Sequence, residues 1–271
     1  MSFRKIFDPA RHPRPMRVAC FMSGSGTNVV KILENQLQKE DRCPYQVMLI
    51  FTDVFDPSNQ KCKAQSISSE YEVDYRHNDI TDFYRCRGRS SKGDLSLRPE
   101  YDRLTLETIQ EHNLDLIALC GYMSIVSQPL LERYNDRIVN VHPADLSVKD
   151  GNRRKYTGLN AVRDAMLAGE KRLYSTTHIV REKVDYGEIL MRSQPVDVIL
   201  PGGVTLQDLA RPENAALVKR IASEHQARLK ERGDWVIYPK TLEMIGEGRY
   251  SLDEQGNVYV DGVLMPDGLR L

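Results

Sequence analysis

Short apolar runs alternate along the chain with stretches in which apolar residues recur at helical spacing. The runs that predict buried strands are 17–22, 45–51, 114–120 and 138–143, with a shorter strand near 72–75. The segments that predict helices between them are 29–34, 61–70, 99–112 and 127–134. Nearly continuous apolar strands separated by helices are typical of a parallel sheet that helices cover on both faces. The pattern therefore predicts an α/β, Rossmann-like, doubly wound fold with a mostly parallel sheet.

The rest of the chain predicts further elements of both kinds. In order, they are a helix at 158–168, a strand at 174–181, a turn at 184–188, a strand at 189–192, a polar helix at 212–232, a second helix from Tyr238 to near Gly246, and a C-terminal β-hairpin of 250–252 with 258–264. No internal repeat or long linker divides these elements, so we expect a single domain over residues 17–271. Residues 1–16 contain three prolines and predict an irregular N-terminal arm. Two charged stretches, 86–97 and 147–154, predict surface insertions, the first of them mobile.

Charge and cysteine content narrow the classes of partner and compartment. Lys plus Arg and Asp plus Glu both number 38, so no overall basic field favours a nucleic acid or a membrane as partner. The five cysteines are widely spread, without a Cys-x-x-Cys pair, which fits a reducing compartment better than a disulfide framework or a zinc site. No apolar stretch has the length of a signal peptide core or a membrane span. We therefore expect a soluble, cytoplasmic protein.

A glycine-rich turn follows the first strand and precedes the first helix. Its sequence is Ser23-Gly24-Ser25-Gly26-Thr27-Asn28. A strand, a glycine turn and a helix in this order point backbone N–H groups and the helix dipole at an anion. The turn lacks the third glycine of a dinucleotide fingerprint and the lysine of a P-loop, which favours a single phosphate as the ligand. A simple tight turn is the more common structure for two glycines at this spacing.

The strand at 138–143 carries the side chains best suited to chemistry. Alternation places Asn140 and His142 on one face, and Pro143 ends the strand because proline cannot donate to a sheet. An open α/β sheet binds ligands at the carboxyl ends of its strands, so the glycine turn should lie near this pair. A strand with a solvated polar face, or with a structural histidine, is the more common interpretation of the six residues alone. Beside a phosphate-binding turn, they indicate a site for a small phosphorylated molecule.

Several stretches, taken in order, resemble the phosphoribosylglycinamide formyltransferase (glycinamide ribonucleotide transformylase) family. They are 23–28, 121–123 with 138–143, 175–180 with 184–190, and 237–239 through 261–262. Each piece alone is weak, but the ordered set is specific, and the resemblance covers residues 17–271. It implies the formyltransferase fold. It also implies an enzyme of purine biosynthesis and one-carbon metabolism, which transfers a formyl group from its co-substrate 10-formyltetrahydrofolate to the primary amine of glycinamide ribonucleotide.

The resemblance assigns roles to three side chains for this reaction. Charge builds on the formyl oxygen when the amine attacks, and Asn140 with a protonated His142 would donate hydrogen bonds to it. Asp185 would keep His142 charged and relay the amine proton, through water. Taken alone, Asp185 is a common turn residue before a glycine, and only its partnership with the other two suggests catalysis. The reaction requires no metal, and we expect none.

The resemblance also implies the binding residues. The phosphate would contact Gly26, Thr27 and Asn28, with Arg98 as a charge partner. The folate would contact Met123, Ser124, Ile125, Val126, Val180 and Asp185. His178 matches a family histidine beside the site, and a structural hydrogen bond and a direct chemical role are equally open for it. The expected partners are small molecules, and we allow for a homodimer.

Two departures from the family pattern leave the acceptor open. A Ser-Leu-Leu-Pro-like turn usually follows the His-Pro pair, whereas this chain has 144–147 and then extra charged residues. Asp234 stands where the family has a glutamate that contacts the substrate amine region. An amino sugar, an aminoacyl group on transfer RNA or water are alternative acceptors. The single-phosphate turn and the lack of a basic domain argue against transfer RNA, and a formyltetrahydrofolate hydrolase needs no phosphate site. A ligand-binding regulator would not need all three of Asn140, His142 and Asp185.

Overall fold

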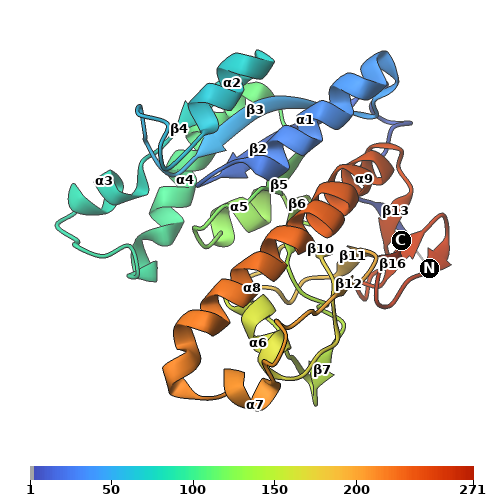
Figure 1. The fold of residues 1–271 in the computed structure, drawn as a ribbon. Coiled ribbons are helices and arrows are strands. Elements are labelled where there is room, and N and C mark those ends of the chain that lie inside the picture. Colours follow the sequence, from blue (N-terminus) through green and yellow to red (C-terminus); the bar gives the residue numbers. More distant parts are fainter. Residues whose placement is uncertain (1–2) are drawn as a thin grey trace.

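The computed structural model describes residues 3–271, and an eight-stranded sheet with the order β16-β11-β10-β6-β5-β2-β3-β4 forms its centre (Figure 1). The strands in chain order are β2 (Met16–Met22), β3 (Tyr45–Thr52), β4 (Asp74–His77), β5 (Leu116–Leu119), β6 (Ile138–His142), β10 (Thr176–Ile179), β11 (Ile189–Arg192) and β16 (Leu269–Arg270). Neighbours from β6 to β4 pair in parallel, as do β11 and β16. Only β10 runs against the rest, since it is antiparallel to both β6 and β11. The predicted mostly parallel α/β sheet is confirmed.

Helices cover both faces of this sheet, and the alternation along β2 shows how. Val18 and Cys20 pack in a cluster with residues of α1 and α9, whereas Ala19 and Phe21 pack on the opposite face with residues of α4 and α5. A strand buried on both faces is therefore apolar at nearly every position, as the sequence indicated. The helices bounding these layers are α1 (Thr27–Lys39), α2 (Ala64–Tyr71), α3 (Ile80–Arg85), α4 (Arg98–Ile109), α5 (Gln128–Arg133) and α9 (Trp235–Gly246).

A separate hydrophobic cluster lies beyond the sheet, where α6 packs on α8. Its elements are α6 (Ala161–Leu167), the pair β9 (Arg172–Leu173) with β12 (Val196–Asp197), α7 (Leu206–Leu209) and α8 (Ala215–Leu229). The buried face of α8 consists of Val218, Ile221, His225 and Leu229, three or four residues apart. This cluster lies in the lower part of Figure 1.

The two helices predicted at 212–232 and 238–246 are in fact one continuous rod. After a 3-10 turn at Pro212–Asn214, α8 continues through a π-helical segment, Lys230–Asp234, directly into α9 (Figure 1). Gly233 lies inside the helix and does not end it. The rod packs closely on the sheet at this point, since an added Cβ would lie 2.4 Å from the Ser175 hydroxyl. A glycine in a helix can thus mark a close contact rather than a terminus.

The N-terminal arm was predicted to be irregular, but part of it is ordered in a second sheet. Arg4–Lys5 (β1) pairs with β13 (Tyr250–Leu252), which continues into β14 (Val258–Val260) and β15 (Val263–Leu264), so the predicted C-terminal hairpin is present. The arm is fixed because Ile6 and Phe7 bury their side chains in the main core. Such a pairing has no local signal, since its partner lies some 245 positions away.

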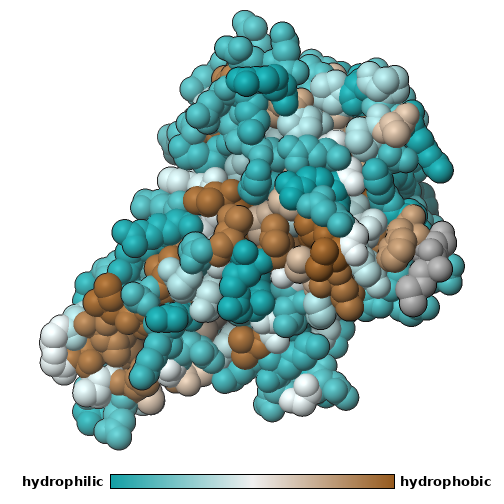
Figure 2. Space-filling view, turned by 90° about the vertical axis from the view of Figure 1, so that its right-hand side faces the viewer, coloured by the Kyte–Doolittle hydropathy of each residue, from teal (hydrophilic) through white to brown (hydrophobic). Residues whose placement is uncertain are grey.

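The two predicted insertions differ in structure. Residues 86–97 are largely exposed and contain only a short 3-10 turn, Leu95–Leu97. The other stretch forms a hairpin of β7 (Lys149–Asp150) and β8 (Arg153–Arg154), which the sequence did not indicate. Further 3-10 turns are Glu40–Arg42 and Gln110–His112. Within residues 3–271, no helix is both long and apolar enough to cross a membrane. Figure 2 shows hydrophobic residues in separate patches on one hydrophilic face.

Candidate active site

Asn140 and His142 lie on one face of β6, as predicted from their alternation. Val139 and Val141, which alternate with them, point to the opposite side and join the core beneath α9. The antiparallel register places His178 of β10 directly opposite Asn140, and Thr176 opposite His142. Four polar side chains from two neighbouring strands therefore share one surface of the sheet, close to the end of β6.

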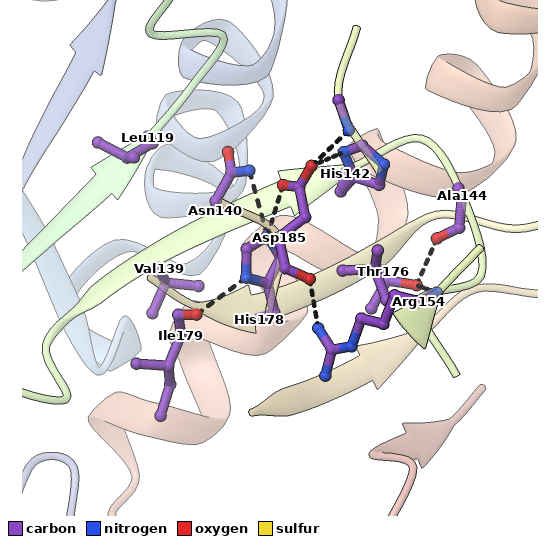
Figure 3. Close-up of polar contacts among 12 residues, drawn as sticks. Leu119, Val139, Asn140, His142, Ala144, Arg154, Thr176, His178, Ile179 and Asp185 are labelled. Carbon is purple, nitrogen blue, oxygen red and sulfur yellow. Dashed lines mark hydrogen bonds and ion pairs between the residues drawn. The ribbon is translucent and has the colours of Figure 1, made fainter. Parts of the chain in front are cut away.

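Asp185 reaches this surface because the connection between β10 and β11 folds back over it (Figure 3). Its Oδ2 lies 3.5 Å from His142 Nδ1, and its Oδ1 lies 3.6 Å from His178 Nε2. Its backbone has φ +60°, a left-handed conformation that is uncommon for aspartate. Gly187 permits the fold-back, because a Cβ there would lie 1.7 Å from the Ile179 carbonyl oxygen. The structure thus brings the three predicted catalytic side chains together.

Two backbone carbonyls set the orientation of the histidines. His178 Nδ1–H donates to the Ile179 carbonyl at 2.9 Å, which leaves Nε2 to accept from the Asn140 amide at 3.3 Å. His142 Nε2–H donates to the Tyr156 carbonyl at 3.0 Å, so its Nδ1 faces Asp185. His178 therefore orients Asn140, which supports a structural hydrogen bond for this residue. An amide nitrogen carries two hydrogens, so Asn140 keeps one for a ligand.

The charges at the site differ in part from the expectation. Burial raises the pKa of Asp185, but its contacts with His178 and His142 and the hydrogen bond from the Gly158 N–H outweigh burial, and the pKa falls to about 2. Burial also lowers the pKa of His142, and the nearby Asp185 carboxylate only partly opposes this. The direction of this shift runs against the expectation that Asp185 holds His142 in its charged form, because desolvation outweighs the ion pair.

The glycine turn has the geometry expected of an anion site. Gly26 has φ +67° and precedes α1, and among residues 3–271 no side chain caps the N–H groups of Thr27 and Asn28. This φ favours glycine, and a Cβ there would also lie 2.4 Å from Ile67 Cδ1, which would have to move. The hydroxyl of Ser23 accepts from the Met123 N–H at 2.8 Å, which joins this turn to the one that follows β5. Because β5 lies between β2 and β6, the turn stands two strands from His142.

Asp234 connects the glycine turn to the start of β10. Its carboxylate accepts from the Ser175 hydroxyl at 2.5 Å and from the Asn28 side-chain amide. Burial raises the pKa of Asp234 to about 6, although both hydrogen bonds act to lower it. The Asn28 Oδ1 atom is buried and has no partner among the described residues. Asp234 and Asn28 thus present acceptor atoms that a bound N–H or O–H group would satisfy.

Arg98 is not joined to the glycine turn by any hydrogen bond within residues 3–271. Arg98 is the first residue of α4, and its side chain is buried. Its guanidinium carbon lies 5.8 Å from the centre of the Tyr84 ring and 5.7 Å from that of the Tyr101 ring. One Nη donates to the Lys92 carbonyl at 3.4 Å, while Nε and the other Nη have no partner in the described chain. A buried cation with unsatisfied donors is a site at which an anion would be favoured.

The residues expected to contact folate are split between surface and core. Met123 is 56% exposed and Ile125 39%, whereas Ser124 and Val126 are buried. The Ser124 hydroxyl already has a partner within the protein, since it donates to the Asp53 carboxylate, which also accepts from the Ser23 hydroxyl. Val180 packs against the same core cluster as Val126. It also lines a hollow of about 370 Å³, whose other lining residues are Gln128, Leu131, Glu132, Asn135, Arg181 and Glu182.

Several contacts at the site could not be found in the sequence. Asp185 Oδ2 accepts from the Gly158 N–H at 2.7 Å, and the Asp185 carbonyl accepts from Arg154 at 2.6 Å. Backbone groups such as those of Gly158 and Tyr156 are present in every residue and leave no sequence signal. For Arg154, its place in a charged stretch was the only indication. Within residues 3–271, no three His, Cys, Asp or Glu side chains are grouped as a metal site would require.

The chain belongs to the formyl transferase family, whose pattern it matches over residues 16–221.

The chain is also similar to individual proteins of known name. The phosphoribosylglycinamide formyltransferase of Haemophilus influenzae is 30% identical over 167 residues, which cover 62% of this chain and 66% of that protein. The trifunctional purine biosynthetic protein adenosine-3 of Drosophila melanogaster is 26% identical over 236 residues, 87% of this chain and 14% of that protein. The match thus spans less than two thirds of each relative. The crystal structure of glycinamide ribonucleotide transformylase 1 from Symbiobacterium toebii has a TM-score of 0.63 and 28% identity, covering 91% of this chain and 94% of its own.

Proposed function

We propose that this protein transfers the formyl group of 10-formyltetrahydrofolate to the primary amine of glycinamide ribonucleotide. The observation that carries the proposal is the meeting of Asn140, His142 and Asp185 on one surface of the sheet: Asp185 lies 3.5 Å from His142 and 3.6 Å from His178, and His178 lies 3.3 Å from Asn140. The names of the relatives support formyl transfer and this acceptor. The glycine turn, whose N–H groups at the start of α1 have no side-chain cap among residues 3–271, suits the phosphate of the ribonucleotide.

Each of the three side chains has its own role in the proposed reaction. The amine nitrogen attacks the formyl carbon, the carbonyl electron pair moves to the oxygen, and the free N–H of Asn140 donates to that oxygen. Neutral His142 accepts the amine proton at Nδ1, where Asp185 stabilises the imidazolium that forms. When the bond between the carbon and folate N10 breaks, the same proton passes to N10. The amine thus gains the formyl group, and tetrahydrofolate leaves with the proton.

The binding residues follow from the same surface. Gly26, Thr27 and Asn28 would hold the phosphate, and the positive charge of Arg98 would balance the negative charge of the phosphate. The Asp234 carboxylate would accept a hydrogen bond from glycinamide ribonucleotide near its amine, in place of the longer glutamate of the family. The folate would lie along Met123–Val126 and Val180, beside the hollow that Val180 lines. The two partners are small molecules, and no step requires a metal.

An assay of the purified protein tests the proposal. We expect release of tetrahydrofolate from 10-formyltetrahydrofolate only when glycinamide ribonucleotide is added, with the formylated product detected by mass spectrometry. Asn140→Ala should lower kcat by about a hundredfold or more, the usual loss for one donor to a developing oxyanion. Release that is equally fast without any amine would indicate hydrolysis. Turnover only with an amino sugar would replace the acceptor and keep the chemistry.

A further inference from the structure

The 149–154 hairpin, β7 with β8, lies against the turn that carries Asp185, residues 183–188. Its last residue, Arg154, is half-buried and makes two hydrogen bonds to this turn. The guanidinium Nη1 donates to the Asp185 carbonyl at 2.6 Å, and the backbone N–H donates to the Tyr186 hydroxyl at 3.1 Å. Both the main chain and the side chain of Arg154 are therefore engaged with the Asp185 turn, and Figure 3 shows the bond from its guanidinium.

The Asp185 turn is a segment whose conformation must be imposed from outside. Asp185 has φ +60°, and a residue with a side chain keeps this backbone conformation only when its surroundings enforce it. The Gly158 N–H fixes the carboxylate at 2.7 Å. The peptide that follows Asp185 is held at both ends: its N–H, from Tyr186, donates to the Lys183 carbonyl at 3.1 Å within the turn, and its carbonyl accepts from Arg154. Arg154 thus supplies the side-chain bond that holds this peptide from outside the turn.

The charge of Arg154 strengthens this hold. Its guanidinium lies 5.8 Å from the centre of the Tyr186 ring, and Lys183 Nζ lies 3.4 Å from the same ring. Two cations therefore flank one aromatic side chain of the turn. A guanidinium is planar and always charged, so it can bind a carbonyl and lie beside an aromatic ring at once.

We propose that Arg154 is a positioning residue that holds Asp185 in its left-handed conformation, and this inference rests on the function proposed above for Asp185. The hairpin that carries Arg154 is thus part of the active-site support rather than a neutral surface loop. Arg154 contacts neither reacting group. It acts only through the direction in which the Asp185 carboxylate faces His142, so its loss should reduce the chemical step more than the binding of either substrate.

Matched variants of neighbouring arginines test the inference. Arg153 is exposed on the same hairpin, and its side chain makes no hydrogen bond or ion pair within residues 3–271, so Arg153→Met is the control. We expect Arg154→Met to lower kcat by about thirtyfold while both KM values change by less than about threefold. Arg154→Lys, which keeps a charged donor, should recover much of the loss. Added guanidinium ion should raise the rate of Arg154→Met and leave Arg153→Met unchanged.

The outcomes separate this inference from the proposed function. An active wild type with equal kcat in the two methionine variants would overturn the positioning role and leave the proposed function intact. A wild type without formyl transfer would remove the proposed function, and amide hydrogen exchange would then decide the structural part. Faster exchange in residues 183–188 for Arg154→Met than for Arg153→Met would support the hold on the turn. Equal exchange would overturn it, and circular dichroism of each variant would verify that it is folded.

Discussion

His178 stands directly opposite Asn140 in the antiparallel pairing of β10 with β6, and its Nε2 accepts a hydrogen bond from the Asn140 amide at 3.3 Å. The Ile179 carbonyl fixes the tautomer of His178, so a backbone group determines how a side chain on another strand is oriented. An amide is nearly symmetric in shape, and without such a partner Asn140 could present its oxygen instead of its nitrogen to the formyl group.

His178→Ala should therefore impair catalysis without removing a group that reacts. We expect kcat to fall by about tenfold to a hundredfold, because Asn140 loses the acceptor that orients it, while folate affinity is retained. His178→Gln can still accept through its side-chain oxygen and should keep more activity. Steady-state kinetics with both variants check this. Equal losses in the two would show that orientation of Asn140 is not the role of His178.

Replacement of Asp234 should separate stability from activity. Its pKa is about 6 in the folded protein and about 3.9 in an unfolded chain, so the folded state binds its proton more tightly. The charged carboxylate therefore destabilises the fold above pH 6, and this cost disappears as the pH falls through 6 toward 4. Asp234→Asn should be more stable than the wild type by about 3 kcal/mol at pH 8 and equal to it near pH 4. Its activity should fall if Asp234 contacts the acceptor.

Urea denaturation of both proteins at several pH values measures this difference. A stability difference that is constant between pH 4 and pH 8 would contradict the raised pKa of Asp234.

Two glycines of the same turn provide a matched test of the phosphate site. In Gly26→Ala, the new Cβ would meet Ile67 at 2.4 Å and the backbone would be strained at φ +67°. We expect the KM for the phosphorylated amine to rise at least about tenfold, since the N–H groups at the start of α1 would move. At Gly24 a Cβ meets no atom within 4 Å, so Gly24→Ala should have a much smaller effect. Similar KM values in the two variants would argue against the turn as the phosphate site.

Arg98→Met should weaken binding of the phosphate while the protein stays stable. Two guanidinium nitrogens of Arg98 are buried without partners among residues 3–271, so removal of the charge costs the free protein little and can stabilise it. A charge-assisted bond to phosphate is worth roughly 1.5–3 kcal/mol, which predicts a KM about tenfold to a hundredfold higher for the phosphorylated amine. Thermal unfolding and kinetics measure the two effects. The same amine without its phosphate serves as the control, and an equal rise in its KM would exclude Arg98 as the phosphate partner.

Much of the sheet could be predicted from the sequence because its signal is local. The buried strands are short apolar runs, and the face shared by Asn140 and His142 follows from alternation alone. The strand β1 could not be predicted, since two residues carry no periodicity and its stability comes from pairing with distant β13. The continuous rod of α8 and α9 was missed for another reason. Gly233 suggests a break, whereas its role is to let the helix approach Ser175.

In the candidate site, the side chains could be predicted from the sequence, but most of the groups that support them could not. The side chains of the proposed triad could be found because their types and order are specific. Their support could not, because it comes from the carbonyl of Tyr156, the N–H of Gly158 and the hairpin that presents Arg154. The lowering of the His142 pKa could not be predicted either, since the extent of its burial is a tertiary property.

The π-helical segment at Lys230–Asp234 lets the rod contain one residue more than a regular α-helix would. A turn closed by i→i+5 bonds takes about one residue more than an α-helical turn, so the flanking helices α8 and α9 keep nearly the rotation that an uninterrupted α-helix would give them. The buried stripe from Val218 to Leu229 therefore still faces α6. Gain or loss of a single residue is thus tolerated best at this point of the rod, because elsewhere in α8 it would turn that stripe away from the cluster packed beside it.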